Sequence, residues 1–200
     1  MPVLREYVKT HLQALTPFRQ SLLLKSPFHE ERMAALLIWV YASQNADERE
    51  QDRIARMFLK AKGSANNWDL IDGSVPDLLG PSLFREVPFM VNAFHRLLRS
   101  RNQWDRRIAI LSTFYSIRKR HFDPALIACS SVLGDHEDLV HKASGWMLRE
   151  AGKRNPTVLR GFLKKHSGRM PRTMLRYAIE RLPERERKRW LRAPTRLQST

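Results

Sequence analysis

Two short segments of this chain combine an aromatic ring with a charged group at helical spacing. Trp68 precedes Asp72 by four residues, and Trp146 precedes Arg149 by three. Residues three or four apart share a face of an α-helix, so we expect each tryptophan beside its charged partner. A partly buried carboxylate acts strongly on a positive centre, which makes Asp72 a candidate catalytic group. The competing interpretation is structural: an aspartate within a helix that hydrogen-bonds to a neighbouring loop.

Two arginines are candidate anion-binding groups. Arg107 and Arg149 occupy corresponding stretches of two similar segments, so both side chains could enter one groove. Guanidinium groups bind phosphates with two parallel hydrogen bonds, which suits neighbouring phosphates of a nucleic acid backbone. Surface salt bridges with the nearby Asp105 and Glu150 explain the two arginines equally well.

A recurring apolar pattern predicts the elements that position these residues. Four similar segments, aligned on a small residue, place alanine at positions 34, 109, 143 and 178. The last two intervals are 34 and 35 residues, and the first, from 34 to 109, is about twice as long. The middle of the first interval falls on Asp72, where a carboxylate replaces the alanine. Helical periods of this length, with almost no alternating strand pattern, predict an all-α, HEAT-like repeat solenoid. We expect stacked antiparallel helix pairs with a concave basic groove, lined by the second helix of each repeat.

Length and composition fit one soluble domain. The 200 residues, 42% of them hydrophobic, suffice for a single core. We therefore expect one domain over residues 1–183 and a basic C-terminal tail over residues 184–200, whose order the sequence leaves open. The single cysteine, Cys129, excludes an internal disulfide and lies in an apolar run, so we expect a buried thiol in a reducing compartment. No signal peptide and no run of about 20 apolar residues is present, which favours a cytoplasmic protein.

The distribution of charge points to a polyanion. The net charge is +16, and the last 60 residues, with 17 Lys and Arg against 4 Asp and Glu, contribute +13 of it. Such a charge favours phosphate backbones over an acidic protein or a membrane, although a solvated tail explains part of it. The seven histidines are scattered, and no CxxC, HExxH or glycine-rich phosphate loop occurs. We expect neither a metal site nor a cofactor.

Three blocks of sequence carry a family resemblance. Residues 60–182 resemble the HEAT-like-repeat DNA alkylation repair glycosylases of the AlkD type, which act on 3-methyladenine and 7-methylguanine. The blocks are Asn67-Trp68-Asp69-Leu70-Ile71-Asp72, Trp104 with Arg106-Arg107-Ile108-Ala109-Ile110-Leu111, and Lys142-Ala143 through Gly145-Trp146-Met147-Leu148-Arg149-Glu150.

The resemblance implies an enzyme of base excision repair. It would hydrolyse the N-glycosidic bond of cationic N3- and N7-alkylated purines in duplex DNA, without a conventional base-flipping pocket. Asp72 would be the catalytic carboxylate. Trp68 and Trp146 would pack on the sugar and backbone at the lesion, and Arg107 and Arg149 would contact phosphates.

The amino end departs from the family pattern, because fewer residues precede Trp68 than the family has. Tyr7 matches an aromatic residue of the family's amino-terminal helix, which would border the lesion. Two alternatives to a glycosylase stay open: a catalytically silent DNA-binding solenoid and a protein-interaction scaffold. In each DNA-binding case we expect a monomer, associated with the nucleoid when it is bound to DNA.

Overall fold

The computed structural model describes residues 2–12, 15 and 17–192, and every regular element within them is helical. The amino-terminal part contains α1 (Pro2–Tyr7), the π-helix η1 (Val8–Leu12), α2 (Pro17–Leu24), α3 (His29–Gln44), α4 (Glu48–Ala61) and the 3-10 helix η2 (Lys62–Ser64). The middle contains α5 (Trp68–Leu78), α6 (Gly80–Phe84), α7 (Pro88–Leu98), α8 (Gln103–Ser112) and α9 (Phe114–Arg118). The carboxyl-terminal part contains α10 (Asp123–Ser131), α11 (Asp138–Arg154), α12 (Pro156–His166), α13 (Arg172–Ile179) and α14 (Glu184–Arg192).

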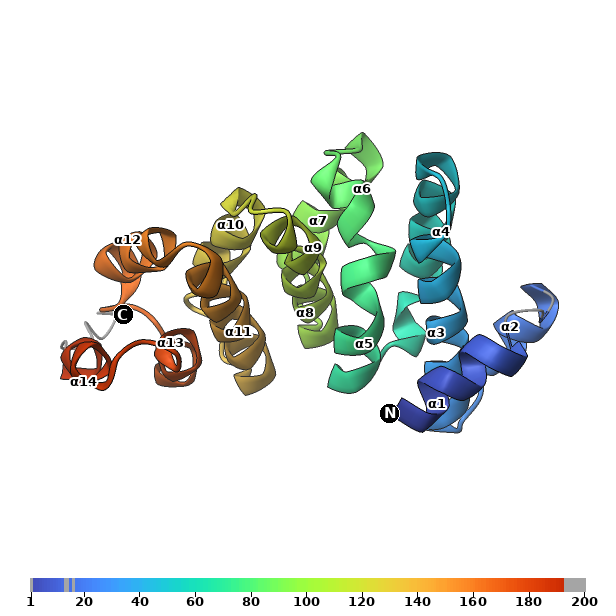
Figure 1. Cartoon of the computed structure of the whole chain (residues 1–200), viewed down its shortest axis with the longest axis horizontal. Coiled ribbons are helices and arrows are strands. Elements are labelled where there is room, and N and C mark those ends of the chain that lie inside the picture. The colour runs from blue at the N-terminus through green and yellow to red at the C-terminus, as the bar shows by residue number, and fades with distance from the viewer. Residues whose placement is uncertain (1, 13–14, 16, 193–200) are drawn as a thin grey trace.

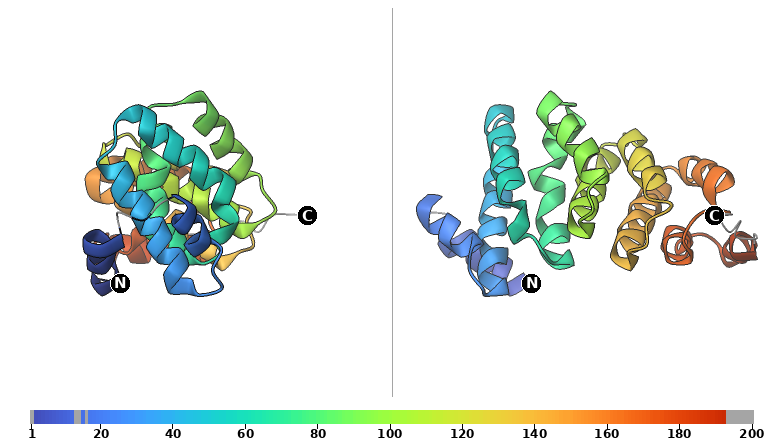
Figure 2. Two further views of the ribbon diagram at one scale, coloured as in Figure 1. Left: turned by 90° about the vertical axis from the view of Figure 1, so that its right-hand side faces the viewer. Right: turned by 180° about the vertical axis from the view of Figure 1, so that it is seen from behind.

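The helices stack side by side into an elongated molecule, with α1–α4 at one end and α12–α14 at the other (Figure 1). One row runs through α3, α5, α8, α11 and α13, each packed against the next. A second row of contacts runs through α4, α6, α9 and α10, in which α6 and α9 follow α5 and α8 after a single residue. The view from behind shows the helices in the same succession along the molecule (Figure 2). This arrangement confirms the predicted all-α, repeat-like fold.

Short polar side chains and prolines begin many of these helices. The side chains of Asp47, Asn102 and Asn155 accept hydrogen bonds from the first-turn N–H groups of α4, α8 and α12. Such caps satisfy donors that have no partner within the helix. Pro88 and Pro156 occupy the first turns of α7 and α12, where the missing N–H is harmless. The sequence therefore sets the points at which the chain reverses between rows.

The aligned repeat positions fall on successive helices of the first row. Ala34, Ala109, Ala143 and Ala178 lie on α3, α8, α11 and α13, and all four are buried. Asp72 lies on α5, between α3 and α8. All five aligned positions thus lie on helices of one row, and Asp72 is the one carboxylate among four buried alanines.

The carboxyl-terminal segment is helical up to Arg192. Trp190 and Leu191 of α14 pack on the core, and Arg172 donates to the Leu191 carbonyl oxygen over 2.9 Å. Arg160 of α12 binds both carboxylate oxygens of Glu186 at 2.9 Å. Residues 184–192 of the expected tail are thus an ordered helix that closes the stack, whereas residues 193–200 lie outside the described part.

Candidate active site

Four helices of the first row contribute to one cavity of about 370 Å³. Because α5, α8, α11 and α13 are neighbours, side chains separated by one repeat in sequence converge there. The lining residues are Trp68 and Asp72 of α5, Arg107 of α8, Leu139, Lys142, Trp146 and Arg149 of α11, and Tyr177 of α13. Both aromatic–charge pairs predicted from helical spacing are therefore in one place.

The central feature of this cavity is a bidentate ion pair between Asp72 and Arg107. The Nε of Arg107 donates to one carboxylate oxygen over 3.0 Å, and Nη2 donates to the other over 2.6 Å. The remaining Nη1 donates to the backbone carbonyl oxygen of Leu139 over 2.5 Å. Arg107 is 4% exposed, so its guanidinium links α5, α8 and α11 from within the stack.

The pair differs from what the sequence led us to expect of Arg107. A phosphate-binding arginine would have donors available to a ligand, and the competing interpretation assigned it a surface salt bridge with Asp105. Asp105 instead binds Lys62 and Ser100. Each of the three guanidinium nitrogens of Arg107 donates one hydrogen bond, to Asp72 or to the Leu139 carbonyl, and a second N–H remains on Nη1 and on Nη2. Arg107 is placed to orient Asp72.

Burial sets the protonation of the carboxylate. The side chain of Asp72 is only 17% exposed. This burial raises the pKa of the Asp72 carboxyl above its usual value, while the hydrogen bonds and charge of Arg107 act in the opposite direction. The site therefore holds a partly desolvated carboxylate, whose ionised form depends on its arginine partner.

Three aromatic side chains border the carboxylate. Trp68, one helical turn before Asp72, is 53% exposed although it is large and apolar. Trp146 is partly buried and packs against Phe114, with ring centroids 5.7 Å apart. Tyr177 reaches the cavity because α13 approaches α11 closely at Gly145: a Cβ there would lie 2.5 Å from the Tyr177 Cβ and from the Met174 carbonyl oxygen. Rings thus face the cavity from α5, α11 and α13.

Arg149 is held less completely than Arg107. Its Nη1 contacts the exposed carboxylate of Glu180, and its Nε lies 4.0 Å from Glu150, which is too far for a hydrogen bond. This buried Nε–H has no acceptor among the described residues. Because only Nη1 of the three guanidinium nitrogens donates to a described residue, Arg149 retains Nη donors for an anionic ligand in the cavity that it lines.

The structure places the other sequence candidates as follows. Tyr7 does not line the cavity: it is 52% exposed and stacks on His11, with centroids 4.7 Å apart. The contact from α1 to α5 is made by Arg5, which donates to the Gly73 carbonyl oxygen over 3.2 Å. Tyr177 and the Leu139 carbonyl were missed, because an alignment on alanines says nothing about which neighbouring side chain faces the cavity.

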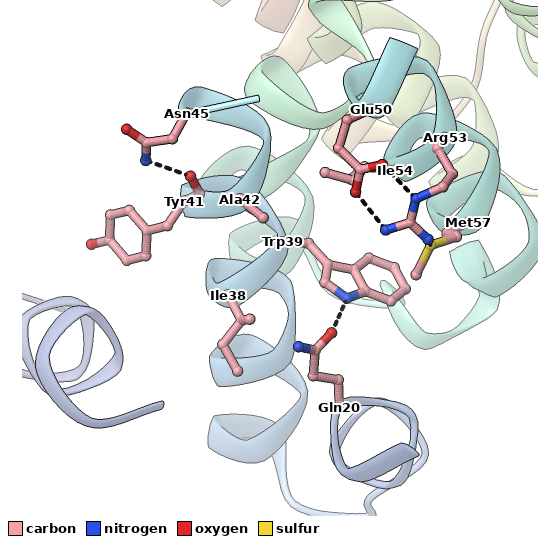
Figure 3. Close-up of a pocket in the computed structure, with 10 residues that line it drawn as sticks. All are labelled: Gln20, Ile38, Trp39, Tyr41, Ala42, Asn45, Glu50, Arg53, Ile54 and Met57. Carbon is pink, nitrogen blue, oxygen red and sulfur yellow. Dashed lines mark hydrogen bonds and ion pairs between the residues drawn. The ribbon is translucent and has the colours of Figure 1, made fainter. Parts of the chain in front are cut away.

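A second cavity, of about 510 Å³, lies between α2, α3 and α4 (Figure 3). Its polar groups are paired: the Trp39 indole N–H donates to Gln20 over 2.9 Å, and Arg53 forks onto Glu50 at 2.5 and 2.6 Å. Trp39 is 6% exposed, as expected of a core tryptophan. This cavity contains none of the candidate catalytic residues.

Other chemistries find few groups to support them. Within the described ranges, no cluster of three His, Cys, Asp or Glu side chains is arranged to hold a metal ion. Burial raises the pKa of the Cys129 thiol, which is completely inaccessible, as its apolar setting predicted. None of the described helices combines the length and apolar character needed to cross a bilayer.

Fold and site together define an all-α, repeat-like protein whose stacked helices hold a carboxylate–arginine pair between aromatic side chains. The model of the DNA alkylation repair enzyme family matches residues 1–182, and the chain belongs to this family. Its structure is similar to that of a predicted DNA alkylation repair enzyme from Enterococcus faecalis, with a TM-score of 0.66 and 18% identity over 92% of this chain and 82% of that one. At this identity the likeness shows the fold. Comparison with curated proteins gave no match.

The family membership confirms the resemblance drawn from the three sequence blocks. It identifies the protein as an enzyme of DNA alkylation repair and DNA as its partner. The site described above is the part of the fold in which a carboxylate, aromatic faces and cationic side chains meet.

Proposed function

We propose that this protein is a DNA glycosylase that hydrolyses the N-glycosidic bond of cationic N3- and N7-alkylated purines in duplex DNA. The observation that carries the proposal is the Asp72 carboxylate, fixed by Arg107 at 2.6 and 3.0 Å inside a cavity bordered by Trp68 and Trp146. The HEAT-like character and the basic groove expected from the sequence belong to the same proposal, as does action by a monomer.

The chemistry needs one carboxylate. Alkylation makes the purine cationic, so the C1′–N bond breaks with its electron pair moving onto the base, which leaves neutral without prior protonation. The sugar gains oxocarbenium character as the bond lengthens, and a nearby carboxylate stabilises that positive charge. Water then bonds to C1′ and loses a proton. Asp72, whose side chain is 17% exposed, is placed to stabilise the charge and to orient the water.

The surrounding groups suit a grip on the DNA backbone. Aromatic faces attract cationic groups, each contact contributing roughly 0.5 to 2 kcal/mol, and the exposed Trp68 offers such a face. Arg149 lines the cavity, and among its guanidinium nitrogens only Nη1 donates to a described residue, so its other Nη donors suit a phosphate oxygen. Excision without a conventional base-flipping pocket, which the resemblance implies, belongs to the same proposal.

The test is release of free base from duplex DNA containing N7-methylguanine or N3-methyladenine. Replacement of Asp72 by Asn keeps the size of the side chain and removes its charge, and we expect excision to fall by roughly 100-fold or more with DNA affinity largely retained. The matched control is Asp77→Asn on the same helix, since Asp77 binds Arg118 and does not line the cavity. Unchanged excision in the Asp72 variant would contradict the assignment.

A further outcome identifies the main alternative. If neither the parent nor the variant releases base, and both bind duplex DNA, the protein is a silent DNA-binding member of its family. In that case Asp72 would have a structural role, as the buried partner of Arg107, and no catalytic role.

A further inference from the structure

Helix α14 carries a stripe of cations on one face. Arg185, Lys188, Arg189 and Arg192 recur at intervals of three, one and three residues, which aligns them along a single side of the helix. All four side chains are exposed. Together with Arg160 of α12 they line a surface cavity of about 800 Å³. This surface lies beyond residue 182, where the match to the family ends.

Other side chains of α14 anchor the helix to the stack. Glu186 accepts two hydrogen bonds from Arg160 and one from the Trp190 indole, and Trp190 and Leu191 pack on the core. Arg172 of α13 holds the Leu191 carbonyl oxygen. The stripe therefore projects from a fixed helix, and the carboxylate of Glu186 on that helix is already bound by Arg160 and Trp190.

Much of the charge on the stripe is uncompensated. The helix contains five Arg and Lys and two Glu. Lys188 pairs with Glu184 at 2.6 Å, but both side chains are more than 60% exposed, where such a pair is weak. No carboxylate of the described residues pairs with Arg185 or Arg192, and residues 193–200 contain no Asp or Glu. Arg189 lies 3.8 Å from the Glu186 carboxylate, which Arg160 already binds. A fixed row of cations with few counter-charges is suited to a regular polyanion.

We propose that α14 is a second DNA-binding element, which holds the phosphate backbone of the duplex that flanks the Asp72 cavity. This inference rests on the proposed function for its partner. Tyr177 of α13 lines the cavity, and α14 packs directly against α13 (Figure 1). Packed helices lie about 8–10 Å apart, so α14 extends the row of cavity-lining helices by one helix. Its seven-residue span of about 10 Å covers roughly three base-pair steps of a duplex.

The experiment compares the salt dependence of binding to an undamaged duplex. The variant Arg185→Gln, Lys188→Gln, Arg192→Gln removes three cations and leaves the Glu186 anchor intact. Each phosphate contact contributes about 0.9 to the slope of log affinity against log salt concentration. We expect this slope to fall by roughly two to three, so that the difference in affinity between parent and variant shrinks by roughly 10- to 40-fold between about 50 and 200 mM salt.

A control variant separates local contacts from net charge. Lys25, Arg49 and Lys119 are exposed cations outside α14, and their replacement by Gln lowers the charge by the same amount. We expect this control to keep the slope of the parent. A conservative variant, Arg185→Lys, Lys188→Arg, Arg192→Lys, should keep it as well, since phosphate contact needs the charge. Any of three results would overturn the proposal. The slope would fall as much in the Lys25, Arg49 and Lys119 control as in the Gln variant of α14, or it would fall in the conservative variant, or it would not fall in the Gln variant of α14.

The two proposals fail separately. Absence of base release by the parent contradicts the glycosylase, whereas the salt slopes, measured on undamaged DNA, still decide the role of α14. Base release with identical slopes for parent and Gln variant would retain the glycosylase and reject the phosphate-binding helix.

Discussion

Replacing Arg107 by Gln should show how much the proposed catalytic carboxylate, Asp72, depends on its partner. In the folded protein the two groups are 17% and 5% exposed, and Arg107 opposes the rise that burial causes in the pKa of Asp72. An opposite charge at hydrogen-bond distance lowers a carboxyl pKa, so without Arg107 the pKa of Asp72 should rise further. Removing one partner of a buried ion pair typically costs about 3 to 5 kcal/mol, and we expect a loss of stability of that order.

The sign of the pH dependence follows from this shift. In the variant, the folded-state pKa of Asp72 lies above its unfolded value of about 3.9, so the folded state holds the proton more tightly. Stability is then greatest below that unfolded value and falls as pH rises through the raised pKa. The loss relative to the parent should therefore be larger at pH 8 than at pH 5. The proposed excision needs ionised Asp72. As the pH is lowered, the rate of base release should therefore begin to fall at a higher pH in the variant than in the parent.

Two assays check this reasoning: single-turnover base release between about pH 5 and 8, and urea unfolding at both ends of that range. The double variant Arg107→Gln, Asp72→Asn removes both charges, and it should regain part of the stability at pH 8 but no activity. Two results together would refute the argument. The rate of base release would fall at the same acidic pH in the parent and in the Arg107 variant, and the variant would lose equal stability at pH 5 and at pH 8.

Two further predictions concern packing. Gly145→Ala should lower the free energy of unfolding by about 1 to 3 kcal/mol, because its Cβ would lie 2.5 Å from the Tyr177 Cβ. Gly161→Ala, whose Cβ would have nothing within 4 Å, should raise the free energy of unfolding by up to about 1 kcal/mol. Equal free energies of urea unfolding for the two variants would contradict the close approach at Gly145. Trp68→Ala should slow base release by roughly 2- to 30-fold with little change in stability, and Trp39→Ala should cost about 3 to 5 kcal/mol of stability, since these side chains are 53% and 6% exposed. Equal destabilisation by both would show that Trp68 is structural.

The sequence predicted the row of site helices because packing repeats with a period. Neighbouring helices of a row need small residues where they approach, so positions 34 to 38 residues apart were aligned, and Asp72 stood out as the exception among alanines 34, 109, 143 and 178. The same logic brought Trp68 and Trp146 to one cavity, since both lie on row helices. Periodicity thus determines which elements meet.

The period of the repeats could not predict which side chains of the site pair with one another. Asp72 and Arg107 are 35 residues apart, one repeat, which makes them neighbours but does not say whether the guanidinium turns toward the carboxylate or toward a ligand. Rotamer choice depends on which donors and acceptors remain unsatisfied after packing, and the Leu139 carbonyl that completes the binding of Arg107 belongs to a third helix. The fold of residues 184–192 was undecided for a similar reason, because its anchor, Arg160 on Glu186, connects distant segments.

The Asp72–Arg107 pair could be thought to neutralise the charge that catalysis needs, but its geometry argues otherwise. An ionised carboxylate has about four acceptor positions, and Arg107 occupies one on each oxygen. The remaining lone pairs stay available on a side chain that lines the cavity. They are sufficient to orient a water molecule and to face a positive sugar, while the guanidinium prevents the carboxylate from turning away. Because Arg107 is buried and tied to the Leu139 carbonyl, this orientation exists before DNA binds, so little reorganisation accompanies the reaction.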